Sequence, residues 1–294
     1  MSNAIIIGTG KIGIDLYIKL KKQKIFNEVL ILNNNKKSVG ALFCKKKKFL
    51  YSDKGINAVK KNIDNTHVIF DCTSATSNSV IVKSLSKYLD KIYYINLTPS
   101  KFGEYVVPYF SNLKIPKRIN LITCGGQTTI PIVLYFKKLL KKKLKYVELI
   151  SSISAKSAGP ATRNNINEYI TNTESAIYKL TGLKKSKVII NINPSVPPVN
   201  MMNSIFFELD RNLSSSKYFE LKKILKNINK KIKFYIPGYN AILFKSFEKK
   251  ILRVTVRVVG QGDYLPQYSG NLDIITSSAV YLAKLIKKKN EKEK

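Results

Sequence analysis

The sequence of 294 residues holds a single histidine, only three cysteines and no long apolar run. The histidine, His67, stands at the start of a predicted strand, and we interpret it as a packing or surface residue. A Cys–His pair or a Ser–His–Asp triad is therefore disfavoured. Cys44, Cys72 and Cys124 are odd in number and widely spaced, which gives neither a disulfide framework nor a zinc-ligand spacing.

Two further absences concern location. No apolar stretch approaches the roughly 20 residues of a membrane span, and a glycine-rich turn begins at Gly8, which leaves no room for a signal peptide. We therefore expect a cytoplasmic protein with reduced thiols. With 44% apolar residues, the chain has enough core for two modest domains, and general disorder is excluded.

Acidic residues are scarce, with 18 against 52 basic residues and a formal net charge of +34. Such a charge ordinarily points to nucleic acid. Here the excess is nearly all lysine, scattered through every segment and accompanied by many Asn and Ile, as an AT-biased coding sequence would produce. A nucleic-acid surface more often clusters arginine with exposed aromatic residues. We therefore do not expect nucleic acid as the main partner, although a positive surface attracts anionic ligands.

Short apolar runs alternate with helical patterns in the first half. Helical spacing covers Ile12–Lys22, and strands are predicted at Asn3–Gly8, Val29–Leu32, His67–Phe70, Ile92–Leu97 and Asn120–Thr123. Continuous apolar strands between helices predict an α/β fold with a parallel sheet covered on both faces.

After Cys124 the order changes towards an α+β domain. Helices are predicted at Thr128 to about Lys142, at about Ile166–Lys179, near Tyr218–Lys230 and at about Ile274–Lys288. Strands are predicted at Tyr146–Ser151, Lys187–Ile192, Ser204–Leu209 and Leu252–Val259. The predicted first domain is 1–124 plus a C-terminal helix at about 271–294, and the second is 125–270.

A G-x-G-x-x-G motif joins the first strand to the first helix. Its glycines allow a tight turn and let a pyrophosphate approach the backbone at the helix N-terminus. The alternative is an ordinary strand–helix turn. We predict that this motif binds a dinucleotide through Gly8, Thr9, Gly10, Lys11, Ile12 and Gly13.

The second strand ends where an acidic residue usually binds the adenine ribose. Asn33 occupies that place, and Asn34, Asn35, Lys36 and Lys37 follow it. Asparagine can hydrogen-bond a hydroxyl but lacks the charge that repels a 2′-phosphate, and the lysines can attract one. The sequence leaves NAD and NADP open.

Cys124 has the most informative setting of the three thiols. Two glycines follow it, and the first turn of the predicted helix holds Thr128, Thr129 and Pro131. A helix N-terminus stabilises a thiolate through its dipole and free amides, which predicts a nucleophile near neutral pH. The local pattern fits a buried structural cysteine equally well. Cys44 and Cys72 lack this setting, and we expect them to be inert.

Several motifs together resemble the acetylating acetaldehyde dehydrogenases that accompany 4-hydroxy-2-oxovalerate aldolases in meta-cleavage degradation of aromatic hydrocarbons. The resemblance covers nearly the whole chain. It is carried by Thr123–Pro131, Ser154–Arg163 and Gly270–Asp273, and also by Asp71–Thr76, Asn96–Pro99 and Asn193–Pro198.

The resemblance implies an N-terminal Rossmann dinucleotide-binding domain joined to a catalytic and dimerisation domain like that of glyceraldehyde-3-phosphate dehydrogenase. Cys124 would attack acetaldehyde or another short aldehyde, NAD would take a hydride, and CoA would release the acyl group. A homodimer and an aldolase partner are also implied. By matching position Asn271 sits by the nicotinamide, and the dinucleotide contacts a loop formed by Ser157, Ala158, Gly159, Pro160, Ala161, Thr162, Arg163, Asn164 and Asn165.

Three positions depart from the family pattern. Asn33 replaces an aspartate, and Ala161 replaces a glycine of the cofactor loop. Asn203 stands where the family has an acid proposed to help activate the thiol. Asparagine cannot accept a proton, so acyl-enzyme formation is expected to slow by roughly 10²–10⁴.

Two other functions stay open. One is a semialdehyde dehydrogenase in which phosphate takes the acyl group, although such enzymes commonly carry a histidine after the cysteine. The other is a non-catalytic subunit that stabilises an aldolase partner. The Asn33 and Asn203 changes favour it, whereas the complete setting of Cys124 opposes it.

Overall fold

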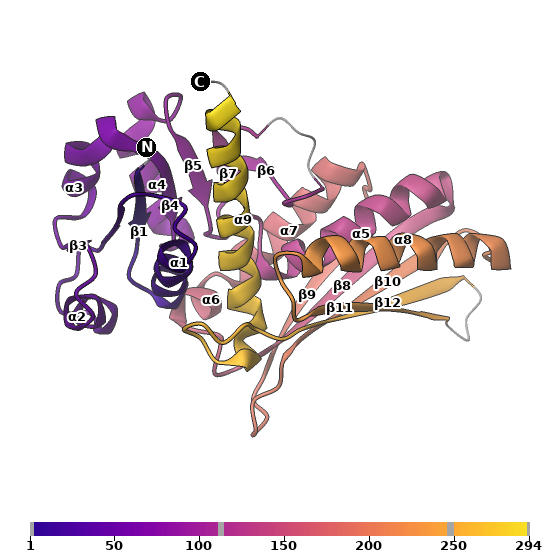
Figure 1. Cartoon of the computed structure of the whole chain (residues 1–294). Coiled ribbons are helices and arrows are strands. Elements are labelled where there is room, and N and C mark those ends of the chain that lie inside the picture. Colours follow the sequence, from indigo (N-terminus) through magenta and orange to yellow (C-terminus); the bar gives the residue numbers. More distant parts are fainter. Residues whose placement is uncertain (1–2, 111–114, 246–249, 293–294) are drawn as a thin grey trace. The chain divides into compact units, whose positions relative to one another are not determined.

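The computed structural model describes residues 3–110, 115–245 and 250–292, without the side chains of Pro160, Ala161, Lys245 and Lys292. The chain divides into two compact units (Figure 1). Unit 1 comprises Met1–Ile122, Asp263–Leu265 and Ile275–Lys294, and unit 2 comprises Thr123–Gly262 and Pro266–Ile274.

Unit 1 is built on a seven-stranded sheet in the order β3-β2-β1-β4-β5-β7-β6, with every pair parallel. Its strands are β1 (Asn3–Ile7), β2 (Val29–Leu32), β3 (Tyr51–Ser52), β4 (Thr66–Asp71), β5 (Tyr93–Asn96), β6 (Glu104–Tyr105) and β7 (Arg118–Asn120). Its helices include α1 (Lys11–Lys22), α2 (Val39–Lys46), α3 (Gly55–Asn62) and α4 (Ala75–Leu85). The four residues Ala4–Ile7 are all buried, so both faces of β1 are covered. The predicted parallel α/β unit is confirmed.

The last helix, α9 (Gly270–Lys292), joins α1 through a buried polar cluster in unit 1. The Thr276 hydroxyl donates to the Asp15 carboxylate over 2.5 Å, and the Lys19 ammonium donates to Thr276 over 3.0 Å. Lys19 also pairs with Asp15, and both side chains are almost fully buried. A buried charge pair favours one geometry, because separating the partners would leave each charge buried and unpaired. The helix that carries the glycine motif is therefore held to α9.

Unit 2 contains a five-stranded mixed sheet in the order β11-β12-β10-β8-β9. Only β8 and β9 pair in parallel among its described strands. The strands are β8 (Leu144–Ser154), β9 (Ser186–Asn193), β10 (Met201–Leu209), β11 (Tyr239–Lys245) and β12 (Ile251–Val258). The helices are α5 (Cys124–Leu140), α6 (Pro160–Asn164), α7 (Ile166–Thr181) and α8 (Ser215–Lys233).

Three helices, α5, α7 and α8, lie on one face of this sheet (Figure 1). Strand β10 alternates accordingly: Asn203 and Phe207 are buried, whereas Met202 is 45% exposed. The ring of Phe207 contacts Phe136 of α5, with centroids 4.9 Å apart. The other face carries exposed apolar side chains, among them Ile242.

One strand of unit 2 is not predicted from the sequence, and the predicted start of one helix is wrong. Strand β11 (Tyr239–Lys245) was not predicted; it is an edge strand whose Ala241 N–H and C=O bind the side chain of Asn229 in α8. Helix α5 begins at Cys124 rather than Thr128, so Pro131 lies inside the helix and not in its first turn. Within residues 3–110, 115–245 and 250–292, no helix has the length and apolarity needed to cross a bilayer.

Candidate active site

The glycine motif forms the turn between β1 and α1. Gly8 has φ 111°, a conformation that favours glycine, and a Cβ on Gly13 would lie 1.9 Å from the Gly8 carbonyl oxygen. A Cβ on Gly10 would meet nothing within 4 Å. Gly10 is also the N-cap of α1 and offers no side chain to its first amides. The turn thus leaves open space beside a helix N-terminus, which fits a pyrophosphate group.

Asn33 follows β2 and faces this turn. Its side-chain N–H group donates to the Thr9 hydroxyl over 2.7 Å and to the Ser38 hydroxyl over 2.9 Å. Ser38 in turn caps α2. Asn33 therefore ties the glycine turn to the start of α2. Lys36 and Lys37 are both exposed on the same connection.

A buried carboxylate supports the neighbouring strand end. Asp71 ends β4 beside Ile7 of β1, and it is fully buried. It accepts hydrogen bonds from Tyr94 (2.6 Å), Asn78 (2.8 Å) and the Thr73 hydroxyl (2.6 Å). We assign Asp71 a structural role that the sequence motif alone does not reveal, because its partners lie on three different segments.

Cys124 is the first residue of α5. Thr123 caps the helix, since its hydroxyl accepts from the Gly126 N–H over 3.0 Å. Ile122, two residues before the thiol, has φ 63°, which is strained for a β-branched residue. The Asn120 side chain accepts from the Ile122 N–H over 2.7 Å and supports this conformation. Local strain of this kind clusters at functional sites.

Tyr169 of α7 brings a hydroxyl to the thiol. The Cys124 sulfur lies 3.9 Å from the Tyr169 oxygen, which also accepts from the Gly125 N–H over 3.1 Å. The hydroxyl itself donates to Ser151 of β8 over 3.1 Å. Neither Tyr169 nor Ser151 is predicted from the sequence. The sequence pattern indicates only that Tyr169 lies on the apolar face of an amphipathic helix.

The expected low pKa of Cys124 is wrong. Burial raises the pKa of this thiol from 9.0 to about 11, and the hydrogen bonds with Tyr169 and with the backbone at Gly125 lower it by less. Burial also raises the pKa of Cys44 to about 11 and that of Cys72 well above 9.0. Position at a helix start, and not pKa, therefore distinguishes Cys124 from the other thiols. Its reactivity should rise with pH towards about 11.

Asn203 lies on the helix-covered face of β10, directly opposite Ser151 of β8. It is completely buried, and neither its side-chain oxygen nor its nitrogen has a hydrogen-bond partner among the described residues. The structure therefore brings Asn203 next to the residue that binds Tyr169, but not into a hydrogen bond with Cys124.

The predicted cofactor loop contains the short helix α6. Ser157, Ala158 and Asn165 are buried, whereas Arg163 and Asn164 are exposed. Arg163 donates to the backbone carbonyls of Ala158 (3.1 Å) and Ala155 (3.4 Å). A Cβ on Gly159 would meet nothing within 4 Å. Thr162 is half-buried, and the predicted contacts of the Pro160 and Ala161 side chains fall outside the described atoms.

Asn271, near the start of α9, is 2% exposed. Its side-chain oxygen has no hydrogen-bond partner among the described residues. An unsatisfied buried acceptor is expensive unless a ligand fills it. A carboxamide N–H group, such as that of a nicotinamide, fits this acceptor.

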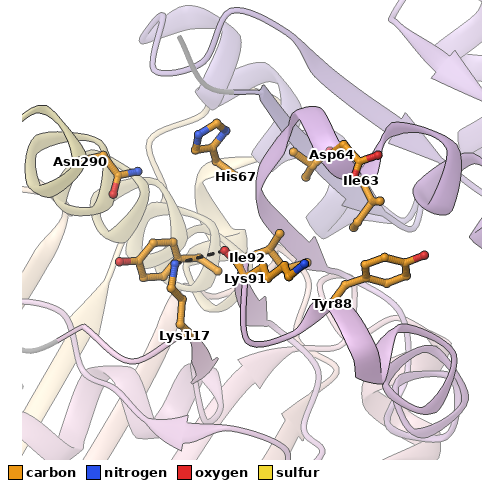
Figure 2. A pocket seen from close by; sticks show the side chains of 10 residues that line it. Ile63, Asp64, His67, Tyr88, Lys91, Ile92, Lys117 and Asn290 are labelled. Carbon is orange, nitrogen blue, oxygen red and sulfur yellow. Dashed lines mark hydrogen bonds between the residues drawn. The ribbon is translucent and has the colours of Figure 1, made fainter. Parts of the chain in front are cut away.

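The single histidine lies away from the glycine turn. His67 is exposed at the amino end of β4. The glycine turn follows the carboxyl end of β1, and β1 is parallel to β4, so His67 and the turn lie at opposite ends of the strands. His67 lines a pocket of about 430 Å³. Figure 2 shows this pocket with Asp64, Lys91 and Lys117 among its lining residues. Lys117 donates to the Lys91 carbonyl over 3.3 Å (Figure 2). His67 belongs to unit 1 and Cys124 to unit 2.

Two family models match the chain. Residues 124–266 match prokaryotic acetaldehyde dehydrogenase, dimerisation, and residues 1–97 match shikimate/quinate 5-dehydrogenase. An acetaldehyde dehydrogenase of Pectobacterium atrosepticum is 36% identical over 96% of this chain and 94% of its own. One of Bacillus cereus is 37% identical over 94% and 91%. Aspartate semialdehyde dehydrogenase II of Vibrio cholerae, solved with ASA, shares the fold with a TM-score of 0.58, 11% identity and coverage of 95% and 97%.

The Rossmann-like parallel sheet of unit 1, the cysteine at the start of α5 and the identity with acetaldehyde dehydrogenases over nearly the full chain place this protein among the aldehyde dehydrogenases. The identity with curated relatives over nearly the full length makes the assignment narrower: the chain belongs to the acetaldehyde dehydrogenase family.

Proposed function

We propose that this enzyme converts acetaldehyde, CoA and NAD to acetyl-CoA and NADH through a thioester on Cys124. The observation that carries the proposal is Cys124 itself, which is the first residue of a capped helix and only half-buried. A half-buried thiol in that place can meet a substrate, and the positive end of the helix dipole favours negative charge near it. The likeness to acetaldehyde dehydrogenases along the whole chain supports it.

In the proposed reaction, the Cys124 thiolate sulfur forms a bond to the aldehyde carbon, the C=O π bond breaks, and its electron pair gives the negatively charged oxygen of a thiohemiacetal anion. A bound nicotinamide would supply the hydride acceptor. Loss of a hydride from that carbon re-forms the carbonyl group and leaves a thioester on Cys124. The CoA sulfur then attacks the thioester carbonyl, and the Cys124 thiolate leaves.

We propose that unit 1 binds the dinucleotide through the turn from Gly8 to Gly13. Ser157–Asn165 and Asn271 belong to unit 2, and the family resemblance proposes them as further cofactor-binding residues. Unit 2 then carries the chemistry. The open space at Gly10 and the unpaired oxygen of Asn271 support these roles. Domain limits near residues 124 and 270 follow this division of roles.

The proposal is tested by incubating the purified protein with acetaldehyde, NAD and CoA, and following NADH by absorbance and acetyl-CoA by mass spectrometry. Omitting CoA should stop steady turnover. Phosphate in place of CoA tests the semialdehyde-type reaction, and acetyl phosphate as the product would contradict our proposal. Absence of turnover with every short aldehyde would favour a non-catalytic subunit.

The cofactor preference depends on Asn33. We expect Asn33→Asp to weaken NADPH binding relative to NADH by roughly tenfold, because a carboxylate there repels a 2′-phosphate. The Thr9 and Ser38 hydroxyls can turn and donate to the new carboxylate, so folding should be preserved. Fluorescence titration of each reduced cofactor gives the two dissociation constants. An unchanged ratio between them would contradict the role of Asn33.

We also propose a homodimer and an aldolase partner. The open sheet face of unit 2 carries Met202, Ile242 and Phe244, each more than a third exposed, which suits an interface. Sedimentation of the purified protein tests the dimer. The aldolase partner, with the catabolic pathway type, rests on motif resemblance. Coexpression with a 4-hydroxy-2-oxovalerate aldolase tests it, and separate elution of the two proteins on gel filtration counts against it.

A further inference from the structure

The Cys124 sulfur has one side-chain hydrogen-bond partner among the described residues, the phenol of Tyr169. Tyr169 is 6% exposed and lies in the first turn of α7. Its oxygen accepts hydrogen bonds from the Gly125 N–H and from the thiol, and its proton points to Ser151. No carboxylate or imidazole of the described residues hydrogen-bonds this sulfur.

Several contacts fix the position of this hydroxyl. A Cβ on Gly125 would lie 2.1 Å from the Tyr169 oxygen and 2.5 Å from the Ser151 oxygen, so only glycine permits the approach. The hydroxyls of Thr123 and Thr173 lie 2.7 Å apart, and Thr173 donates to the Tyr169 carbonyl over 2.7 Å. The cap of α5 and the first turns of α7 are thereby joined beside the thiol.

We propose that Tyr169 is a catalytic residue that stabilises the Cys124 thiolate by donating its hydroxyl proton to the sulfur, with Ser151 as a positioning residue. When the thiol loses its proton, the sulfur becomes a stronger acceptor than the Ser151 oxygen. The phenol then turns from Ser151 to the sulfur. The catalytic consequence rests on the proposed function of Cys124, whereas the hydrogen bond itself does not.

The surroundings suit a donor rather than a base. Burial and the neighbouring thiol hold the pKa of Tyr169 well above 10, so the phenol keeps its proton. Strands β8 and β10 offer Ser151 and Asn203 on this face, and neither residue titrates near neutral pH. Tyr169 is therefore the titratable group that faces the sulfur from the helices and strands of unit 2 packed around it, within the described residues.

The test is the pH profile of Cys124 alkylation by iodoacetamide between pH 7 and 11, with peptide mass mapping to separate Cys124 from Cys44 and Cys72. We expect Tyr169→Phe to move the Cys124 profile up by about one pH unit, because a donor to the thiolate is lost. Below the pKa, alkylation should be roughly threefold slower, since the more basic thiolate is also more nucleophilic. Tyr178→Phe, the same change at an exposed position of α7, should leave the profile unmoved.

A Tyr169→Phe profile that coincides with the wild type or moves to lower pH would overturn the proposal. If that variant does not fold, Ser151→Ala decides, because it retains the phenol and removes the competing acceptor. Its profile should move to lower pH, and an upward move or none would overturn the proposal. Failure of the proposed function is distinguishable, since it would appear as acetaldehyde turnover that persists in Cys124→Ala, whatever the alkylation profiles show.

Discussion

Replacing Cys124 with alanine is expected to lower kcat/KM for acetaldehyde oxidation by roughly 10³ or more, because no group is left to form the thioester. The change should leave the fold intact, since Thr123 still caps α5 and Pro131 and the rest of the helix are untouched. The measurement is NADH formation with saturating CoA, together with intact-protein mass spectrometry of the acyl-enzyme when CoA is omitted. Wild-type protein should gain the mass of one acetyl group, and the variant none.

Cys44→Ala is the matched control for this prediction. Cys44 is completely buried in α2 of unit 1, and burial raises its pKa to about 11, as for Cys124. If thiol acidity alone determined function, the two substitutions would act alike. We expect Cys44→Ala to retain turnover per folded molecule, at a stability cost of about 1 kcal/mol from the lost packing. If Cys124→Ala retained as much turnover as Cys44→Ala, Cys124 would not be the nucleophile of the reaction.

Much of unit 1 could be predicted because its signals are local. The strand predicted at Val29–Leu32 matches β2 residue for residue, and the run from Asn3 matches β1. Apolar runs that end in a glycine turn need no distant partner to be recognised. The same holds for Asn33, whose place after β2 follows from the strand end alone, although its bonds to Thr9 and Ser38 do not.

The setting of Cys124 could be predicted only in part. The helical pattern of the sequence predicts a helix that begins at Thr128, after the two glycines, and glycine has a low helix propensity. In the structure Gly125 lies in the first turn of α5, which Thr123 caps. Glycine is required there because a side chain would collide with Tyr169 and Ser151, which lie 44 and 26 residues further along the chain. The low pKa that the helix start predicts for Cys124 is also not found, because burial of the sulfur raises the pKa by more than its hydrogen bonds lower it. Both errors come from tertiary contacts that periodicity does not encode.

Asn203 illustrates the same limit. The sequence has an amide where the family resemblance predicts an acid, but it does not show that the amide lies opposite Ser151 on a buried strand face. A completely buried amide without a partner destabilises a fold by about 1–3 kcal/mol. The position of Asn203 beside the Tyr169 and Ser151 pair fits a polar site rather than simple packing.

Gly10→Ala and Gly13→Ala should affect different properties, although both glycines belong to one turn. We expect Gly13→Ala to lower stability and Gly10→Ala to weaken dinucleotide binding. At Gly13 a Cβ would lie 1.9 Å from the Gly8 carbonyl oxygen, a backbone atom that can yield only if α1 moves away from β1. We expect Gly13→Ala to lower the free energy of unfolding by about 3 kcal/mol, measured by urea denaturation.

At Gly10 the new Cβ would meet no atom within 4 Å, and φ of −73° is open to alanine, so stability should change by less than about 1 kcal/mol. The methyl group would instead occupy the space in which a pyrophosphate approaches the backbone. Gly10→Ala should therefore raise the dissociation constant for NADH by roughly tenfold or more, measured by fluorescence titration. Binding equal to that of the wild type would show that this turn is an ordinary strand–helix connection, because only a bound ligand makes the empty space at Gly10 necessary.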